Sequence, residues 1–561
     1  MPYYISKEGN HKNMAGETGF KAIPIGIDDF KEVRQGNYYF VDKSELISDI
    51  LADRAKVYLF TRPRRFGKSL NLSMLDAFFN VKYRGNNWFD GLKISECEGA
   101  EPEKNSVPVI YFNMKDLSVD DYGAFIQDLN LKISRLFQEY NLGDGVSTSP
   151  ENMDIYKRGR AQKLNESELR SSVAILCRIL QDTYGAAPIV LIDEYDNPIN
   201  NAFDKQSYGR IFDFLYNFYS STFKSNEHLK FAAITGVMQI AKETIFSGLN
   251  NLYVNNVLSK EYDERYGFTE PEVEELCTYY GHEEKYGEAK EWYDGYRFGD
   301  AEIYNPWSIL NYIKSGFEPA PYWARTSGND IIDNLLDHAD EDTYSKLVSL
   351  GNGQTIEVML SPRVVMNDLA SDRNAIYSVM VMAGYLKAVP LTRGYEISIP
   401  NAEMMRVFET MMMHRIHSDA EIAFGNLFDG MEVNDTALME RSLRRIMDEN
   451  IPFILLSRER DYQLIIGAAA MGRLGRYTVS LEEEAGDGRA DILMKPNRAG
   501  LPNIVLELKK TDSGDPRECA VKALCQIKER EYFRSLSGKV FIYGLCFRGK
   551  DFALLSEEIS R

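Results

Sequence analysis

An α/β fold with several domains is predicted for this chain on three observations. Through the first half, short apolar segments alternate with longer amphipathic ones, the pattern of a mostly parallel sheet covered by helices. The chain has 561 residues, which is more than one hydrophobic core can organise. From Pro452 onward, a compact tail has its own succession of helices and strands. We therefore expect a parallel-sheet domain, a helical middle region and a separate α/β tail.

The elements of the parallel sheet follow from local patterns. The apolar run Val57–Thr61 ends in a turn rich in Pro and Arg, and the apolar spacing from Leu70 to Phe79 is that of a helix. Gly185 and Pro188 separate a later helical pattern from the next apolar run. Strands are predicted at 57–61, 107–113, 189–192 and 229–235, and helices from Leu70, at 122–140 and at 169–184.

Shifts in composition mark the expected domain boundaries. Acidic helical segments begin near Tyr262, and aromatic residues gather between Trp292 and Trp323. The expected domains are 1–260 with the parallel sheet, 261–400 as a helical, aromatic-rich middle domain, 401–450 as a helical connector and 451–561 as the tail. The tail is predicted to have the order αβββαβ, with helices at 453–474 and 516–534 and strands at 477–482, 489–494, 503–509 and 540–547.

Charge, hydropathy and cysteine spacing exclude several classes of protein. The net charge of -19 argues against a surface coated with basic groups, although residues 54–68 and 521–550 are locally basic. No segment approaches the roughly 18 continuous apolar residues of a membrane span, so we expect a cytoplasmic protein without a membrane partner. The six cysteines include no C-x-x-C pair, and they are predicted to be ordinary thiols.

The segment from Arg62 to Ser69 is a candidate phosphate-binding loop. It lies between a predicted strand and a predicted helix, where backbone amides and a helix N-terminus favour polyphosphate. Gly67 permits tight entry into the helix, Lys68 would reach the β and γ phosphates, and Ser69 would ligate Mg²⁺. The alternative is a helix start with solvated basic residues. The residues predicted to line the nucleotide are Arg62, Pro63, Arg64, Arg65, Phe66, Gly67, Lys68 and Ser69.

A second acidic motif supports a P-loop ATPase. The strand predicted at 189–192 ends in Asp193, which would hold the magnesium, and Glu194, which would polarise the attacking water. The strand predicted at 107–113 would place an additional strand between the two motif strands. Thr235 ends the next strand, where a sensor of the γ phosphate or a simple strand-terminal Thr is expected. Together the motifs predict a P-loop NTPase that binds ATP and Mg²⁺.

These motifs resemble those of the bacterial AAA-ATPase-like family. The resemblance rests on four segments, which are Ile25–Phe30, Tyr39–Lys43, Thr61–Ser69 and Asp193–Asp196. The general P-loop pattern begins with Gly, whereas the form with Arg at position 62 is usual in that family. The resemblance therefore implies that Arg62 is a family variation, and it implies ATP hydrolysis.

Three residues of the tail could serve a metal-dependent phosphodiesterase. Asp491 lies in one predicted strand, and Glu507 and Lys509 close the next. Phosphodiester cleavage needs carboxylates that converge on Mg²⁺ and a nearby Lys. Glu507 and Lys509 are two residues apart on a strand, so their side chains point to the same face. The alternative is that such residues merely occupy half-exposed strands.

Members of the resembled family commonly end in a domain similar to PD-(D/E)XK nucleases, which have a restriction-endonuclease-like fold. The tail fits that pattern, which implies that Glu484 joins Asp491 and Glu507 at the metal and that Gln526 with Tyr532 partners the Lys. The basic stretch 521–550 would track a nucleic-acid backbone or form a solvated helix face.

Three functions remain open at this point. The first is an ATPase whose nucleotide state governs a nuclease-like domain that acts on nucleic acid, with DNA favoured over RNA. The second is a signalling switch that uses the tail as a binding module. The third is a protein remodeller with a decayed nuclease fold. The chain would act as a homo-oligomer or with a protein partner.

Overall fold

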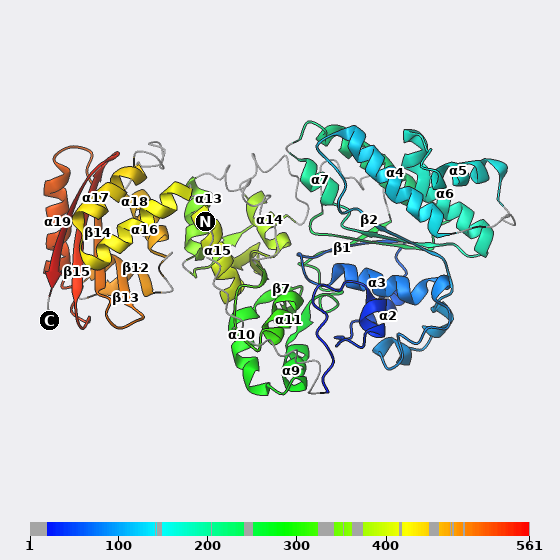
Figure 1. Ribbon diagram of the computed structural model, residues 1–561, viewed down its shortest axis with the longest axis horizontal. Helices are drawn as coiled ribbons and strands as arrows, with labels where there is room; N and C mark the ends of the chain where they lie inside the picture. The colour runs from blue at the N-terminus through cyan, green and yellow to red at the C-terminus, as the bar shows by residue number, and fades with distance from the viewer. Residues whose placement is uncertain are drawn as a thin grey trace, which may run out of the picture. The chain divides into compact units, whose positions relative to one another are not determined.

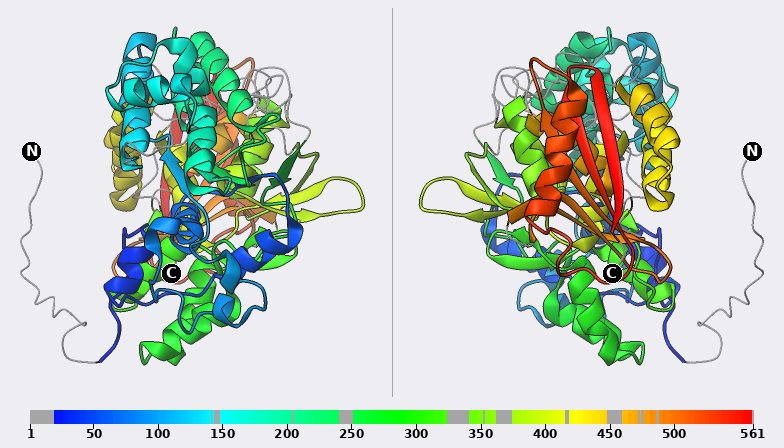
Figure 2. Two further views of the ribbon diagram at one scale, coloured as in Figure 1. Left: turned by 90° about the vertical axis from the view of Figure 1, so that its right-hand side faces the viewer. Right: turned by 90° about the vertical axis from the view of Figure 1, so that its left-hand side faces the viewer.

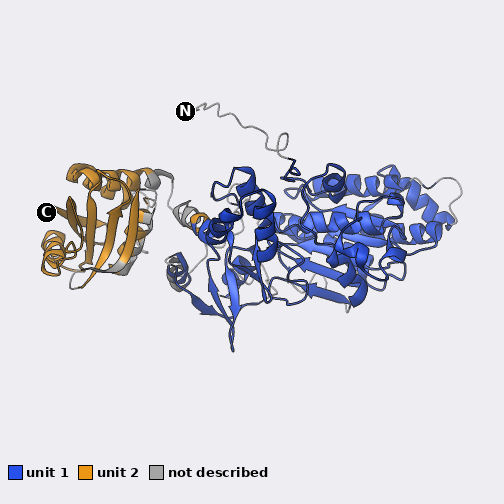
Figure 3. Cartoon of the chain, turned by 90° about the horizontal axis from the view of Figure 1, so that it is seen from below, with its two compact units in different colours: residues 1–405 blue, residues 406–561 orange. Residues whose placement is uncertain are grey.

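Contacts between residues divide the chain into two compact units, Met1–Met405 and Arg406–Arg561 (Figure 3). The computed structural model describes residues 19–140, 142, 148–203, 205–239, 251–323, 341–351, 353–361, 374–414, 418–447, 459–471, 473, 476–485 and 488–559. Among the helices in these ranges, none has the length and apolar character needed to cross a membrane.

A five-stranded parallel sheet organises the first unit, which confirms the predicted α/β class. Its strands are β1 (Val57–Thr61), β2 (Val109–Asn113), β3 (Ile189–Asp193), β4 (Ala232–Gly236) and β5 (Leu252–Asn255). The spatial order is β2-β3-β4-β1-β5, so the strand between the two motif strands is β4 and not β2 as predicted. The prediction was wrong because crossover connections set the order of parallel strands, and chain order does not reveal it.

Helices cover both faces of this sheet (Figure 1). On one face lie α2 (Glu45–Asp53) and α3 (Lys68–Phe79), and on the other lie α4 (Tyr122–Glu139), α5 (Pro150–Arg160) and α6 (Glu166–Tyr184). Helix α6 starts at a capping box of Asn165 and Glu168. The described helices α1 (Phe30–Gln35), α7 (Asn197–Ala202) and α8 (Tyr208–Phe223) and the 3₁₀ turns Val81–Tyr83, Lys93–Glu96 and Glu101–Glu103 complete this part.

The rest of the first unit is helical and rich in buried aromatic residues, with two small sheets. One sheet has the order β6-β8-β7 and the other the order β10-β11-β9. The strands are β6 (Phe268–Thr269), β7 (Tyr296–Phe298), β8 (Ala301–Tyr304), β9 (Ile356–Val358), β10 (Lys387–Pro390) and β11 (Tyr395–Ser398). The helices are α9 (Glu270–Tyr279), 3₁₀ Glu283–Lys285, α10 (Tyr286–Tyr293), α11 (Pro306–Lys314), α13 (Glu341–Gly351) and α14 (Ala375–Ala383). Helix α15 (Ala402–His414) begins in the first unit and ends in the second.

The second unit is a five-stranded mixed sheet with helices packed against it. The helices are α16 (Ser418–Val433), α17 (Thr436–Arg445), α18 (Glu459–Met471) and α19 (Pro516–Glu529). The strands, in spatial order, are β12 (Tyr477–Ala485), β13 (Gly488–Pro496), β14 (Asn503–Lys510), β15 (Val540–Arg548) and β16 (Asp551–Ile559). Only β14 and β15 run parallel among these described neighbours. Residues of α16 and α17 share one hydrophobic core with α18 and the sheet.

The predicted tail order αβββαβ omits the final strand, because the structure adds β16 after β15. Residues 549–550 turn the chain, and Gly549 adopts the left-handed φ of 61°. Most side chains of β16 are half-exposed, so its sequence lacks the strong apolar alternation of an inner strand. Part of the helix predicted at 453–474 lies outside the described residues, and its described portion is α18.

One pair of cysteines departs from the prediction of free thiols. Cys519 of α19 and Cys546 of β15 form a disulfide, with Cα atoms 5.7 Å apart. Helix α19 packs closely across β15 because Gly544 has no side chain, and a Cβ there would lie 2.5 Å from the carbonyl oxygen of Ala520 (Figure 2, right). The residues are 27 positions apart, so tertiary packing alone joins them. Cys97, Cys177, Cys277 and Cys525 are free, as predicted.

Candidate functional sites

The loop between β1 and α3 forms a turn around the Lys68 ammonium. Arg65 and Gly67 both have left-handed backbone, with φ of 71° and 83°, which curls the chain tightly before the helix. Lys68 is buried, and its Nζ donates to the carbonyl oxygens of Arg62 at 2.9 Å and Pro63 at 2.7 Å. Burial lowers the pKa of Lys68 to about 8. The ammonium group therefore lies beneath the loop at the start of α3.

Asp193 contacts polar side chains from the start of α3 and from the ends of neighbouring strands. Ser69 Oγ donates to Asp193 Oδ2 at 2.6 Å, and Thr235 Oγ1 donates to Asp193 Oδ1 at 2.5 Å. Asn113, at the end of β2, also donates to Asp193 Oδ2, at 3.2 Å. The structure thus brings the sequence-predicted residues Ser69, Asp193 and Thr235 together. Sequence analysis did not include Asn113, although its place at the carboxyl end of a predicted strand was a usable signal.

Glu194 and Asp196 flank this cluster in different ways. Glu194 is half-buried with a left-handed φ of 52°, and its amide donates to Asp193 Oδ1 at 3.0 Å. Burial, together with the Asp193 charge, raises the pKa of Glu194. Asp196 is buried and accepts from the amides of Val237 at 2.8 Å and Met238 at 3.0 Å. It therefore ties the turn after β3 to the turn after β4, a role that sequence analysis did not assign.

The Arg62 side chain is held by the end of β5 and the residues that follow it. Its guanidinium is fully buried and donates to Asn255 Oδ1 at 2.6 Å, to the Asn255 carbonyl at 3.1 Å and to the Tyr262 carbonyl at 3.2 Å. It also lies 5.0 Å from the ring centroid of Tyr266. Burial lowers the pKa of Arg62 to about 10. The contact of Arg62 with Lys68 is made by the Arg62 backbone carbonyl, which accepts from Lys68 Nζ.

Replacing Arg62 by methionine is expected to destabilise the first unit by about 3 kcal/mol, because it leaves several buried acceptors without a donor. Urea unfolding followed by fluorescence would measure the loss. The exposed neighbour Arg64 provides the control, and Arg64→Met is expected to leave the unfolding midpoint nearly unchanged. Equal midpoints for Arg62→Met and the parent would contradict the anchoring role.

The aromatic-rich segment 292–323, together with Gly384, contacts the candidate phosphate-binding loop. Four consecutive loop residues each meet an aromatic or glycine partner from this set, and these partners were not predicted. The contacts are Pro63 with Gly384, the Arg64 carbonyl with Trp323 Nε1 at 3.4 Å, the Arg65 guanidinium over Trp307 at 4.3 Å, and Phe66 with Tyr296 at 5.1 Å and Phe298 at 5.0 Å between ring centroids. The loop is therefore held from outside by the aromatic-rich segment.

A second candidate site lies where β13 and β14 separate. Asp491 of β13 accepts from the Leu508 amide at 2.6 Å through Oδ2, and Lys509 Nζ donates to Glu507 Oε1 at 2.9 Å. Burial raises the pKa of Asp491, and burial together with the Asp491 charge raises the pKa of Glu507 to about 7. The predicted trio therefore converges on one place.

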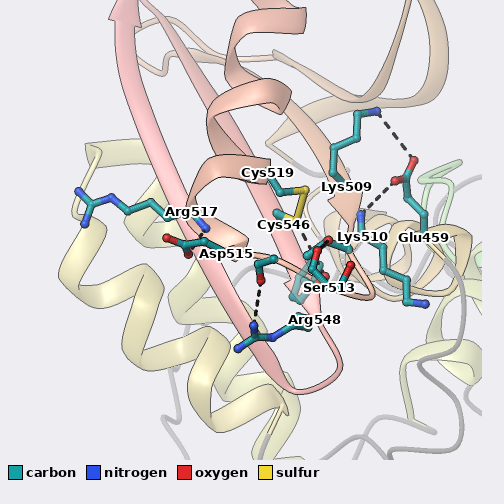
Figure 4. The surroundings of a disulfide bond; sticks show 12 residues. Glu459, Lys509, Lys510, Ser513, Asp515, Arg517, Cys519, Cys546 and Arg548 are labelled. Atoms are coloured by element: carbon teal, nitrogen blue, oxygen red, sulfur yellow. Dashed lines mark hydrogen bonds and ion pairs between the residues drawn. A yellow bond between two sulfur atoms is a disulfide. The ribbon is translucent and has the colours of Figure 1, made fainter.

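Polar side chains from two helices surround this trio. Gln526 of α19 donates to Glu507 Oε1 and, at 3.0 Å, to the Tyr532 hydroxyl, whereas the resemblance implied that this pair partners the Lys. Gln463 of α18 donates to Asp491 Oδ1 at 3.0 Å. Glu459 of α18 lies 3.8 Å from Lys509 Nζ and accepts from the Lys510 amide at 3.0 Å (Figure 4). Sequence analysis missed Glu459 and Gln463, although their i,i+4 spacing places both on one helix face.

One carboxylate oxygen of the second site could bind a divalent cation. Glu507 Oε2 is buried and has no hydrogen-bond partner among the described residues, so one carboxylate oxygen remains available as a hard ligand. Within the described ranges, no three Asp, Glu, His or Cys side chains gather closely enough to hold a metal. Glu484 lies in β12, where its backbone pairs with Arg489 of β13, and the Glu484 side chain lies outside the described part of the chain.

Comparisons with known proteins match the segments that contain the two candidate sites. Residues 24–246 match a family described as predicted AAA-ATPase, and residues 457–557 match the PD-(D/E)XK nuclease superfamily. An uncharacterized protein from the vnfD 5′ region of Azotobacter chroococcum mcd 1 is 27% identical over 548 residues, which cover 94% of this chain and 96% of that protein. The chain therefore carries an AAA-ATPase-like domain followed by a C-terminal domain of the PD-(D/E)XK nuclease superfamily.

Proposed function

We propose that the protein hydrolyses ATP and that its nucleotide state governs a Mg²⁺-dependent nuclease-like domain acting on cytoplasmic nucleic acid, with DNA favoured over RNA. The observation that carries this proposal is the cluster in which Asp193 binds Ser69 and Thr235 beside the buried Lys68. This arrangement supplies a cation for phosphate, a hydroxyl and carboxylate for Mg²⁺, and a polar contact from the neighbouring strand.

The first site has the groups that ATP hydrolysis requires. Lys68 would exchange the carbonyls of Arg62 and Pro63 for phosphate oxygens, which are stronger acceptors because they are charged. Ser69 and Asp193 would hold Mg²⁺, which neutralises charge on the phosphates. Glu194 would orient water and take its proton, and burial favours this role because it raises the pKa of the carboxyl group.

The second site has the groups for phosphodiester hydrolysis. Asp491 and Glu507, with Glu484 as a third carboxylate, would hold Mg²⁺, which polarises the scissile phosphate. Lys509 would stabilise charge that develops on the phosphate oxygens. Gln463 and Gln526 would act as positioning residues, because each donates to one of the two carboxylates.

The variant Glu194→Gln tests the assigned role in hydrolysis. It is expected to bind Mg-ATP with unchanged affinity while kcat falls about 100-fold, because the amide still orients water but cannot accept its proton. Calorimetry and phosphate release measure the two quantities separately. Undiminished turnover would remove Glu194 from the mechanism.

A nucleotide-dependent switch with a purely binding tail is the second candidate function. It is favoured by a series of contacts that starts at the candidate loop. The Arg64 carbonyl accepts from Trp323 Nε1, and the Trp323 backbone amide donates to buried Glu403 at 2.8 Å. Ser308 Oγ donates to the other Glu403 oxygen at 2.7 Å. Glu403 lies in the first turn of α15, and the boundary between the two compact units falls within that helix.

This second function predicts that nucleic-acid affinity depends on the bound nucleotide while no strand is cut. Fluorescence anisotropy with labelled DNA would compare the Glu194→Gln protein in ATP and in ADP. Equal affinity in both nucleotides and without nucleotide would defeat the switch.

A further inference from the structure

The disulfide between α19 and β15 lies beside the candidate nuclease site. In the parallel ladder of β14 and β15, Cys546 is the register partner of Lys509. Partners in a ladder direct their side chains to the same face of the sheet. Figure 4 shows the disulfide near Lys509, with Cys519 on the first turns of α19. The covalent link therefore joins the strand next to Lys509 to the helix above it.

The same helix supports Glu507. Gln526 lies seven residues after Cys519, which is about two helical turns, and its amide donates to Glu507 Oε1. Glu507 is the carboxylate whose second oxygen is buried without a hydrogen-bond partner in the described structure. The position of α19 on β15 thus determines how Glu507 is presented to a metal.

The two sulfur atoms differ in access. Cys546 is completely buried, whereas Cys519 is only partly buried, so an external thiolate would approach the bond from Cys519. We propose that Cys519 and Cys546 form a thiol–disulfide switch for the metal site, an inference that rests on the function proposed for this domain. The oxidised pair holds α19 in place, and reduction loosens the helix and weakens metal binding.

The reductive step needs a dithiol as co-reactant. One thiolate of the dithiol attacks the Cys519 sulfur, the Cys519–Cys546 bond breaks, and the Cys546 thiolate leaves and takes up a proton. The second thiol of the reductant then displaces Cys519 from the mixed disulfide. In total two electrons and two protons enter the protein, and the reductant ends as its own disulfide.

Other contacts hold the start of α19 without the disulfide. Arg548 Nη1 donates to the Gly514 carbonyl at 2.8 Å, and the Asp515 side chain caps α19 by accepting from the Arg517 amide at 2.9 Å (Figure 4). The change is therefore local to α19 and the carboxylate that it supports. Loss of the hydrogen bond from Gln526 to Glu507 is expected to lower metal affinity about 10-fold or more, as for other groups that orient a metal ligand.

The experiment compares the full-length protein before and after dithiothreitol treatment. Calorimetry with Mn²⁺ measures metal affinity, and hydrogen exchange of residues 515–530 measures the order of α19. The variant Cys519→Ser removes the link, and Cys525→Ser is the matched control, since Cys525 is an exposed free thiol on the same helix.

We expect reduction of the parent to weaken Mn²⁺ binding about 10-fold and to speed exchange in α19. Cys519→Ser should show the weaker affinity in both conditions, and Cys525→Ser should respond as the parent does. Mn²⁺ binding that is equally tight in both states would overturn the switch and leave the metal site standing. Absence of Mn²⁺ binding in both states would instead defeat the metal site, and this inference with it.

Discussion

Replacement of Lys68 by alanine is expected to lower kcat/KM for ATP about 1000-fold, because it removes the cation that would bind the β and γ phosphates. The loss should appear in binding as well as in turnover, since Lys68 would contact the phosphates before and during hydrolysis. Calorimetry with Mg-ATP and a phosphate-release assay would measure both effects.

A lysine of the same unit provides the control for charge. Lys157 is exposed on α5, and Lys157→Ala changes the net charge by the same amount without reaching the loop. It should keep the parent's affinity and turnover. If Lys68→Ala gave the same heat of binding as Lys157→Ala, the first unit would not be a phosphate-binding domain of the proposed kind.

Replacement of Lys509 by alanine is expected to reduce Mg²⁺-dependent cleavage of nucleic acid about 1000-fold, because no other described cation contacts Glu507. The substrates to compare are single-stranded and double-stranded DNA and RNA, each with and without ATP. Chelation of the metal should reduce cleavage by the parent about as much as the Lys509→Ala substitution does.

The neighbouring lysine is a matched control for this variant. Lys510 follows directly in β14, but its Nζ pairs with Asp512 at 2.5 Å and not with Glu507. Lys510→Ala should therefore cut nearly as well as the parent. Equal loss in both variants would indicate that basic charge on β14, and not the Lys509 contact, is what matters.

Several residues of these sites could be predicted from short stretches of the chain. The loop Arg62–Ser69, the strand end at Asp193 and the pair Glu507 and Lys509 each combine a local pattern with a specific residue type. The structure confirms the parallel sheet and brings Ser69, Asp193 and Thr235 into contact. Parallel strands end at one edge of a sheet, so residues at predicted strand ends could be expected to meet.

Local sequence therefore specified β1–β4 and β12–β15, the loop and the acidic and basic residues that would act on phosphate, because hydrophobic period and side-chain chemistry are properties of neighbouring residues. Long-range packing specified the rest. The place of β4 between β1 and β3, the burial of the Arg62 guanidinium against Asn255, and the joining of Cys519 to Cys546 each depend on segments far apart in the chain. Such contacts arise from crossovers and helix packing, and no local pattern records which distant segment will be the neighbour.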